Sequence, residues 1–459
     1  MIILVNPMWS VEHLNKDSNY VHIKKVIERY TEMYPNTYFI IPFPVKNFKY
    51  HEDGFFENMN VLRVPYIIPL SKKINNITFD GAFFNNIVEK YGVHTIYNQI
   101  PEVTGQLKCL DTHFTSNLNV VNQHHYIYHD SLPYPLKNQM QYVYWQIVGD
   151  ALADVNIFNS QYTKNMVEDN IQKYMPEFGN KIAENSVVIP FGLWNKSSIV
   201  KNKKFDKFTF VYNHRLQQYK NWETTFDVFD ELQKTYDFDV ALCPVGPVNI
   251  AQVNSRPYTR VFECKNQNEY YDVLSRCHAN TFNSQYETFC ISIFESMMLG
   301  LATIVPNSTT MPELLGQNNP QLFDNKKEQI EKLTSLLKDN AKAEVFGLQN
   351  QKQAKKFNID NYCQSLHKIF TEQLTKVNRH ETLKDKNKDK LQKYLDKHKK
   401  ISVHNMKKIR RFINLSNQSV PNHRLVNIMY HAGYDQVIEN NEAYFVKIVD
   451  KPPKWLIFI

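Results

Sequence analysis

One segment in the second half of the chain constrains the fold more than any other. Within residues 283–315, an acidic loop leads into a short apolar helix, and an apolar strand follows at 301–306. The strand stops at a proline, and residues 311–315 form a further turn that carries the acid Glu313. Helices that alternate with buried strands build an α/β fold, so we expect this class for the chain.

Two glutamates, Glu287 and Glu295, stand eight positions apart in this segment. That spacing is a little over two helical turns, so one carboxylate before the helix and one within it can face the same elongated ligand. Phe289, Cys290 and Ile291 are predicted to open the helix, where free N–H groups and the helix dipole favour a diphosphate. A solvated helix face is the ordinary interpretation of an isolated pair, whereas the strand and turn that follow here favour a binding site.

The whole segment resembles the donor-site signature of family 4 glycosyltransferases, which are retaining enzymes of the GT-B architecture. Its first acid is followed by Phe289 and Cys290, and its second acid by Met298 and Gly300. The Pro-Glu pair at 312–313 completes the match. The resemblance implies two Rossmann-like doubly wound domains that face a cleft, a nucleoside-diphosphate sugar as donor, and neither a metal nor another cofactor.

The resemblance also implies a role for each donor-site residue. Glu287 would hold hydroxyls of the sugar and Glu295 the ribose, while the amides around Cys290 would hold the phosphate. Upstream, Arg215 and Lys220 stand where the family has its Arg and Lys. Fixed cations there would neutralise the diphosphate as the sugar–phosphate bond breaks, although a pair of surface cations is the alternative.

The chain departs from the family pattern beside both cations. Asn213 and His214 replace the usual glycine before the arginine, and Asn221 replaces the glycine after the lysine. Both cations remain, and we expect a tighter loop around them.

Three shorter segments extend the resemblance over much of the chain. Residues 187–192 resemble the strand and turn that end the first domain, and residues 153–160 resemble the strand before it. Residues 244–247 resemble a loop on the nucleotide side of the second domain. Gly246 and Cys264 are therefore expected to line the nucleobase pocket.

The resemblance divides the chain into an acceptor-side domain at 1–193 and a donor domain at 194–358. A helix at 359–375, with apolar residues every three or four positions, is expected to cross back to the first domain. A basic appendage at 376–459 follows. The length of 459 residues fits two domains plus an appendage better than one core.

The first residues read as the start of a doubly wound unit, with a buried strand at 1–7 and a helix at 21–34 before the next strand. Family members carry a Gly-rich loop after the first strand, but residues 8–16 contain no glycine. The phosphate-binding role of that loop is therefore not assigned. Trp9 and His13 are assigned instead to the acceptor site, with plain packing as the alternative.

Three histidines, His124, His125 and His129, follow a predicted strand. Two of them with Asp130 could ligate a metal, but nothing else in the sequence completes a ligand set. The family resemblance places a histidine at the end of this strand against the transferred sugar. We choose His124 for that role and keep His125 as the near alternative, while a structural histidine bonded to the backbone is the other interpretation.

The net charge of +8 comes from the C-terminal appendage. Residues 376–411 hold fourteen Lys and Arg against four Asp and Glu, whereas residues 412–459 are neutral and residues 1–375 carry −2. Six basic residues near the end of this stretch are the candidate contacts to nucleic acid. They are Lys399, Lys400, Lys407, Lys408, Arg410 and Arg411.

The appendage resembles a winged-helix-like module of α+β type. A helix is predicted at 422–431, and the strands 436–438 and 444–448 read as a hairpin. A basic face on such a module favours nucleic acid. An anionic membrane surface and a solvated or oligomerising appendage are the alternatives; residues 384–400 offer few bulky apolar side chains for a membrane.

The composition indicates the cellular compartment in which we expect the protein. No apolar run approaches the roughly 20 residues that span a bilayer, and no signal peptide is recognised, so we expect a soluble cytoplasmic protein. The six cysteines form no Cys-x-x-Cys pair and are predicted to be free thiols in a reducing compartment. Only 12 glycines beside abundant Asn, Lys, Ile and Tyr suggest an AT-rich coding sequence, typical of a phage or a low-GC bacterium.

Together these features predict a glycosyltransferase that moves a sugar, with retention, onto a hydroxylated or hydroxymethylated base of phage DNA. Such a base must be flipped out of the duplex, and a basic surface would hold the strand. The leaving phosphate oxygen can accept the proton of the acceptor, so no enzyme base is named. Alternatives are a transferase for a cell-surface glycan, teichoic acid or lipid-linked acceptor, and a protein that only binds; the complete set of cations and acids disfavours the second.

Overall fold

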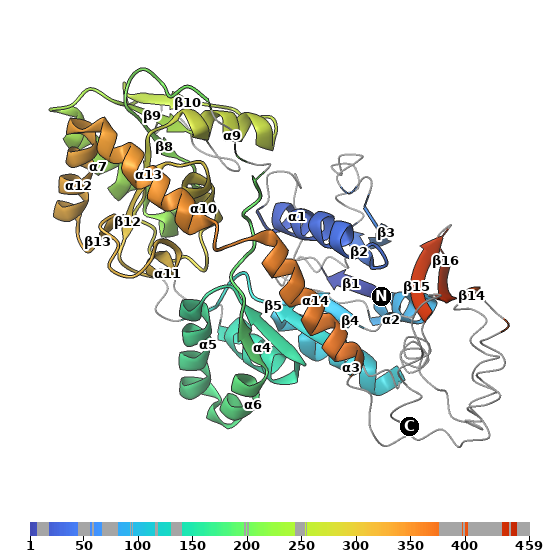
Figure 1. The fold of residues 1–459 in the computed structure, drawn as a ribbon. Coiled ribbons are helices and arrows are strands. Elements are labelled where there is room, and N and C mark those ends of the chain that lie inside the picture. The colour runs from blue at the N-terminus through green and yellow to red at the C-terminus, as the bar shows by residue number, and fades with distance from the viewer. Residues whose placement is uncertain are drawn as a thin grey trace.

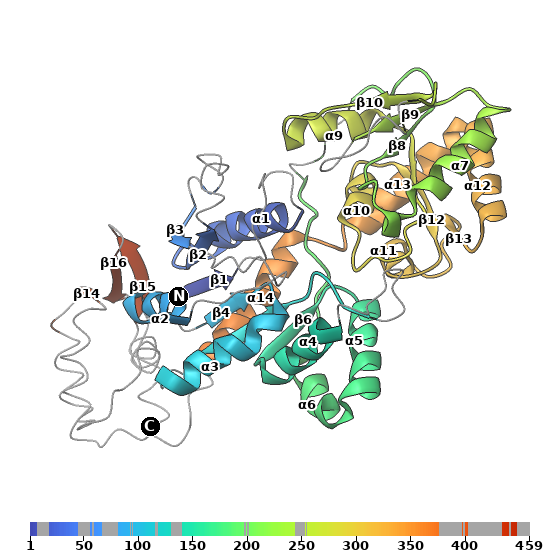
Figure 2. The ribbon, with the colours of Figure 1, turned by 180° about the vertical axis from the view of Figure 1, so that it is seen from behind.

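The computed structural model describes residues 1–6, 18–44, 56, 59–66, 81–91, 93, 95–114, 118–129, 140–196, 199, 202–243, 253, 255–375, 397, 400–402, 434–439 and 442–447. These residues form a seven-stranded sheet, a six-stranded sheet and a three-stranded sheet. Figure 1 shows the first two as separate bodies, and Figure 2 shows the same division from behind. The predicted α/β fold with two Rossmann-like domains is confirmed.

The first domain is built on a parallel sheet with the strand order β3-β2-β1-β4-β5-β6-β7. Strand β1 is buried along its whole length, as expected for a strand that helices cover on both faces. The strands are β1 (Ile2–Asn6), β2 (Tyr38–Pro44), β3 (Val61–Tyr66), β4 (Thr95–Asn98), β5 (Asn119–Gln123), β6 (Val155–Phe158) and β7 (Ser186–Val188). The helices are α1 (Ser18–Met33), α2 (Gly81–Tyr91), α3 (Thr104–Phe114), α4 (Met140–Leu152), α5 (Gln161–Tyr174) and α6 (Gly179–Glu184).

The second domain repeats this architecture with the order β10-β9-β8-β11-β12-β13. Its central strands are again fully buried. The strands are β8 (Thr209–Tyr212), β9 (Asp239–Leu242), β10 (Thr259–Val261), β11 (Ala279–Thr281), β12 (Ala302–Pro306) and β13 (Leu322–Phe323). The helices are α7 (Trp222–Gln233), α9 (Gln267–Arg276), α10 (Ile291–Met298), α11 (Met311–Leu315), α12 (Lys326–Lys338) and α13 (Asn340–Ala354).

The chain crosses between the domains twice, and the two crossings lie together. Trp194 pairs with Asn358 as an isolated bridge, and helix α14 (Ile359–Thr375) then packs against α1 and β4 of the first domain. A Cβ on Gly192 would lie 2.3 Å from the Cβ of Tyr362 on α14, so only glycine fits this crossing. Helix α14 thus returns the chain to the first domain, at the position predicted for the crossing helix.

The third sheet is antiparallel, with the order β14-β16-β15. The predicted hairpin is present as β15 (Tyr434–Glu439) and β16 (Glu442–Lys447), and β14 (Lys400–Ser402) adds a third strand. This sheet lies beside α2 and β2, on the side of the first domain away from the second (Figures 1 and 2). The helix predicted at 422–431 lies outside the described residues. Among the described helices, none has the length and apolar character to cross a bilayer.

Candidate active site

A cavity of about 580 Å³ opens between the two domains. One wall comes from α1, from the loop after β5 and from the segment after β7, and the other from the loops of the second domain around α9 and α10. The four residues expected to grip the donor all line it. They are Arg215, Lys220, Glu287 and Glu295.

Lys220 and Glu287 form a buried ion pair in this cavity. Lys220 Nζ donates to Glu287 Oε1 at 2.5 Å, and it also lies 4.8 Å from the ring centre of Tyr219. Burial alone would lower the pKa of Lys220, but the charge of Glu287 outweighs it and the pKa ends above its usual value. Lys220 is therefore a cation that Glu287 holds in a fixed position in the cavity.

The residues that depart from the family pattern keep these loops in shape. Asn221 has φ 47° and ψ 45°, the left-handed conformation that Asn adopts more readily than most residues with a Cβ. Asn213 Nδ2 donates to the hydroxyl of Tyr270 at 2.8 Å and to the carbonyl of Ser292 at 3.0 Å. Asn221 thus takes a conformation that favours glycine, and Asn213 ties its loop to α9 and α10.

Cys290 caps α10 with φ 64°, also in the left-handed region. A non-glycine residue in that conformation is strained and is a mark of functional loops. Helix α10 begins at Ile291, so Phe289 lies in the turn rather than in the helix as predicted. All three residues line the cavity, and the first turn of the helix offers its N–H groups to an anion.

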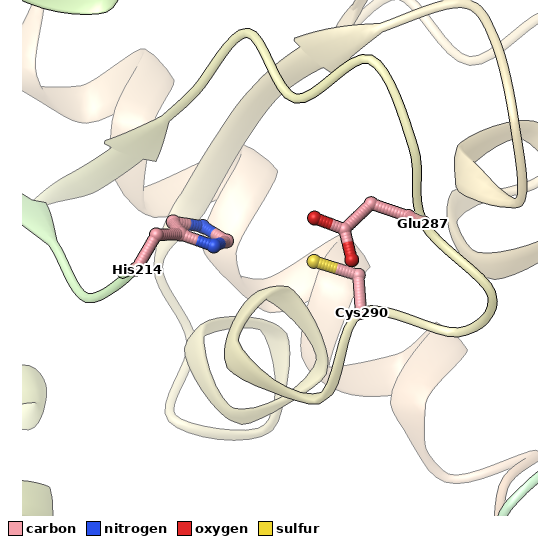
Figure 3. Close-up of side chains that lie close together, drawn as sticks. All are labelled: His214, Glu287 and Cys290. Carbon is pink, nitrogen blue, oxygen red and sulfur yellow. The ribbon is translucent and has the colours of Figure 1, made fainter. Parts of the chain in front are cut away.

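His214, Glu287 and Cys290 point toward one another (Figure 3), with their ligand atoms all within 4.8 Å. Burial lowers the pKa of His214, with a further contribution from Lys220, so its ring is neutral. An imidazole, a carboxylate and a thiol are donors that suit Zn²⁺. Glu287 is already paired with Lys220 at 2.5 Å, and a donor site without a metal stays a prediction.

Glu295 is held by two tyrosines of α9. Its Oε2 accepts from the hydroxyl of Tyr270 and its Oε1 from that of Tyr271, each at 3.0 Å. Lys25 of α1, in the other domain, donates to the Tyr271 hydroxyl at 2.8 Å. Burial raises the pKa of Glu295, while Lys25 and the two tyrosines oppose the rise. Sequence patterns could not indicate Lys25, because it lies 246 positions from Tyr271.

His124 does not face the cavity, so its assignment to the transferred sugar is wrong. Its ring stacks on Phe158 with centroids 4.3 Å apart, and its Nε2 lies 3.0 Å from Oδ1 of Asp150. His125 lines the cavity instead, with its Nε2 2.6 Å from Oε1 of Gln99. Successive side chains at the end of a strand point to opposite sides, so only one of these two neighbouring histidines can face the cavity.

The remaining candidates divide between the cavity and segments outside the described residues. Cys264 lines the cavity. Lys400 is exposed in β14 and is not among the cavity residues. The others lie outside the described residues, and their assignment stays a prediction. They are Trp9, His13, Gly246, Lys399, Lys407, Lys408, Arg410 and Arg411.

Backbone and side-chain contacts bridge the domains next to the cavity. The hydroxyl of Thr288 donates to the carbonyl of His125 at 2.9 Å. The carboxylate of Glu313 accepts from the N–H groups of Gln161 at 2.8 Å and Tyr162 at 2.7 Å, at the start of α5. A carboxylate at a helix N-terminus is favoured by the helix dipole. The two domains are therefore in direct contact at these residues.

Residues 195–353 match the family model described as glycosyl transferases group 1. The chain is 22% identical over 284 residues to the tRNA-queuosine alpha-mannosyltransferase of Drosophila melanogaster, covering 56% of this chain and 74% of that protein. Sucrose-phosphate synthase from Thermosynechococcus elongatus superposes with a TM-score of 0.62 at 12% identity, over 81% of this chain and 98% of that one. Anabaena HepE in complex with UDP-glucose superposes with a TM-score of 0.58 at 13% identity. The match covers 81% of this chain and 100% of that one. The resemblance to GT-B glycosyltransferases predicted from the sequence is thereby confirmed.

Proposed function

We propose that this chain, a GT-B glycosyltransferase that takes sugar from a nucleotide-sugar donor, transfers it with retention to a hydroxyl group on a modified base of DNA. The observation that carries the donor half is the convergence of Arg215, Lys220, Glu287 and Glu295 on one cavity between the domains. The solved neighbour HepE holds UDP-glucose, which supports a donor of this class.

Each residue at the cavity has a physical task in this proposal. Lys220, fixed by its bond to Glu287, and Arg215 would meet the charge that develops on the diphosphate. Glu287 would orient sugar hydroxyls, and the amides that start α10 would bind a phosphate. Glu295, which also lines the cavity, would hold the ribose.

In the transfer step, the bond from the anomeric carbon to the leaving phosphate oxygen breaks and a bond to the acceptor oxygen forms on the same face. The acceptor hydroxyl gives its proton to the departing phosphate oxygen, so the nucleoside diphosphate leaves with that proton. This route needs no carboxylate base on the opposite face. Lys220 stabilises the same phosphate oxygens as the sugar bond weakens.

The nucleic-acid acceptor has two supports. The relative from Drosophila is named for transfer of mannose to queuosine in tRNA, so a related chain glycosylates a modified nucleoside. This chain also holds fourteen Lys and Arg against four Asp and Glu in residues 376–411, a balance that suits a polyanion. A cell-surface glycan, teichoic acid or lipid-linked acceptor is the second candidate, with the basic segment resting on acidic lipid.

The test mixes the full chain with UDP-, GDP- and ADP-sugars and with DNA that contains hydroxymethylated or hydroxylated pyrimidines. Digestion to nucleosides and mass spectrometry would show a base heavier by one sugar, and NMR of that product would show the anomeric configuration of the donor. Matched tRNA and glycan acceptors run in parallel. Transfer to glycans alone would overturn the acceptor, and an inverted product would overturn retention.

A further inference from the structure

Five aromatic side chains form a continuous path from the cavity wall to the surface of α4. Tyr286 packs against Tyr126 with centroids 5.2 Å apart, and Tyr126 packs against Tyr128 at 5.0 Å. Tyr128 stacks on Tyr142 at 5.0 Å with an interplanar angle of 16°, and Tyr142 meets Trp145 edge-on at 5.5 Å. We call Tyr286, Tyr126, Tyr128, Tyr142 and Trp145 the aromatic track.

The inner end of the track belongs to the donor cavity. Tyr126, Tyr128 and Tyr286 all line it. Tyr286 is anchored across the domain boundary, because its hydroxyl donates to the carbonyl of Ile127 at 2.9 Å and accepts from the N–H of the same residue at 2.8 Å. The inner rings are therefore fixed in the wall of the cavity.

The outer end of the track is open. Tyr286 is 4% exposed and Tyr128 9%, whereas Trp145 is 43% exposed. Tyr126 and Tyr142 are partly buried, so the row of packed rings becomes more open toward Trp145. Exposed aromatic surface that is continuous with a site is typical of recognition surfaces.

Stacking suits a nucleic acid better than most ligands, because each base has a flat π-face and aromatic side chains bind such faces with little dependence on sequence. A base that must reach the donor has to leave its own stack first. The rings of the track that stay partly exposed, Trp145, Tyr142 and Tyr126, would replace the lost stacking, while the buried Tyr128 and Tyr286 hold them in place. Burial also raises the pKa of Tyr128 and Tyr286, so these rings carry no charge to repel phosphates.

We propose that the aromatic track is the acceptor subsite, on which unpaired bases of a nucleic acid stack so that the base to be modified enters the cavity beside Tyr126 and Tyr286. This inference rests on the proposed function and specifies where its acceptor lies. It assigns Trp145 and Tyr142, which do not line the donor cavity, to acceptor binding alone.

The test compares Trp145→Ala and Tyr142→Ala with Tyr144→Ala, using transfer to a single-stranded modified oligonucleotide. Tyr144 is the matched control, because it lies on the same helix, is 37% exposed, and contacts Tyr174 rather than the track. We expect the KM for the oligonucleotide to rise roughly tenfold or more in the two track variants, as loss of one base–aromatic stack predicts. The KM for the donor and its slow hydrolysis without acceptor should stay as in the wild type.

Two further measurements guard the interpretation. Trp145→Phe keeps a ring and should recover most of the loss, and thermal unfolding shows that each variant is folded. An oligonucleotide carrying 5-iodouracil beside the target should photo-crosslink to the track, mapped by mass spectrometry.

The outcomes separate the two proposals. If the wild type modifies nucleic acid but Trp145→Ala and Tyr142→Ala behave like Tyr144→Ala, the track is not the subsite and the proposed function stands. If the wild type modifies only a glycan, the proposed function falls, and a raised KM for that glycan in the track variants would assign the track to carbohydrate instead of bases.

Discussion

Lys25 of the first domain donates a hydrogen bond of 2.8 Å to the hydroxyl of Tyr271 in the second domain. Tyr271 in turn donates to Glu295 at 3.0 Å, so the residue expected to hold the ribose is tied to helix α1 across the cleft. Burial lowers the pKa of Lys25 and the charge of Glu295 opposes that change. The proposed binding site of the ribose therefore depends on both domains.

Lys25→Met should weaken donor binding. The substitution keeps the apolar stem but removes the cation that faces Glu295 and the bond that joins the domains. We expect the donor KM to rise roughly tenfold, the usual effect of losing a charged hydrogen bond of about 1.5 kcal/mol, with a smaller change in kcat. The control is Lys24→Met, at the preceding position of the same helix. Equal donor KM values for the two variants would contradict the role of Lys25.

Glu313→Ala should slow transfer by loosening contact between the domains. The change leaves the N–H groups of Gln161 and Tyr162 without their carboxylate partner, and a charge at a helix N-terminus contributes about 0.3–1 kcal/mol. Small-angle scattering should show a larger radius of gyration, and kcat should fall several-fold. Glu328→Ala removes a similar carboxylate-to-backbone bond within the second domain alone. It should lower stability without changing the radius.

Glu287→Gln should remove most of the transfer activity with folding intact. The amide keeps the shape but takes the counter-ion from Lys220, which is buried beside it. We expect kcat to fall about a hundredfold, as for loss of one charge-stabilising contact in other enzymes. Lys220→Ala should have an effect of the same order. Glu223→Gln, an exposed residue at the start of α7, should behave as the wild type; wild-type rates in Glu287→Gln would remove the assigned role.

The convergence of the predicted donor-site residues on one cavity could be expected from the sequence because these residues are local. Glu287, Cys290 and Glu295 lie within nine consecutive positions, and the loop, helix and strand around them carry a strong pattern. Arg215 and Lys220 follow a buried strand in the same way. Where parallel strands end at one edge of a sheet, residues after each strand meet, so these two segments were bound to converge.

The rest of the site could not be found by pattern. Lys25 meets Tyr271 only because the domains close on each other, and nothing in either helix marks the pair. His124 and His125 differ by one position, and the direction of the strand end decides which one is buried against Phe158. The aromatic track joins α4, the loop after β5 and the loop before α10, and no local spacing connects these three segments.

The stability of the protein should fall as the pH drops below about 6.5. Burial, helped by Lys204, lowers the pKa of His278 to about 4, so the folded state stays neutral where the unfolded chain takes up a proton. The unfolded state then binds more protons between pH 6.5 and 4, and acid favours unfolding in that window. His278→Gln, outside the cavity lining, should reduce the loss of stability between those pH values by less than the roughly 3 kcal/mol of the full shift, because solvent screens the partly exposed ring. Urea unfolding at several pH values checks this, and an unchanged pH dependence would contradict it.

The central claim is that a nucleotide sugar held between the two domains is delivered to a base in nucleic acid. Nucleoside mass spectrometry after incubation of the full chain with donor sugars and hydroxymethylated DNA tests it most directly. We predict a nucleoside heavier by one sugar with the wild type and none with Glu287→Gln. An unmodified nucleoside pool together with a newly glycosylated glycan or lipid would contradict the account.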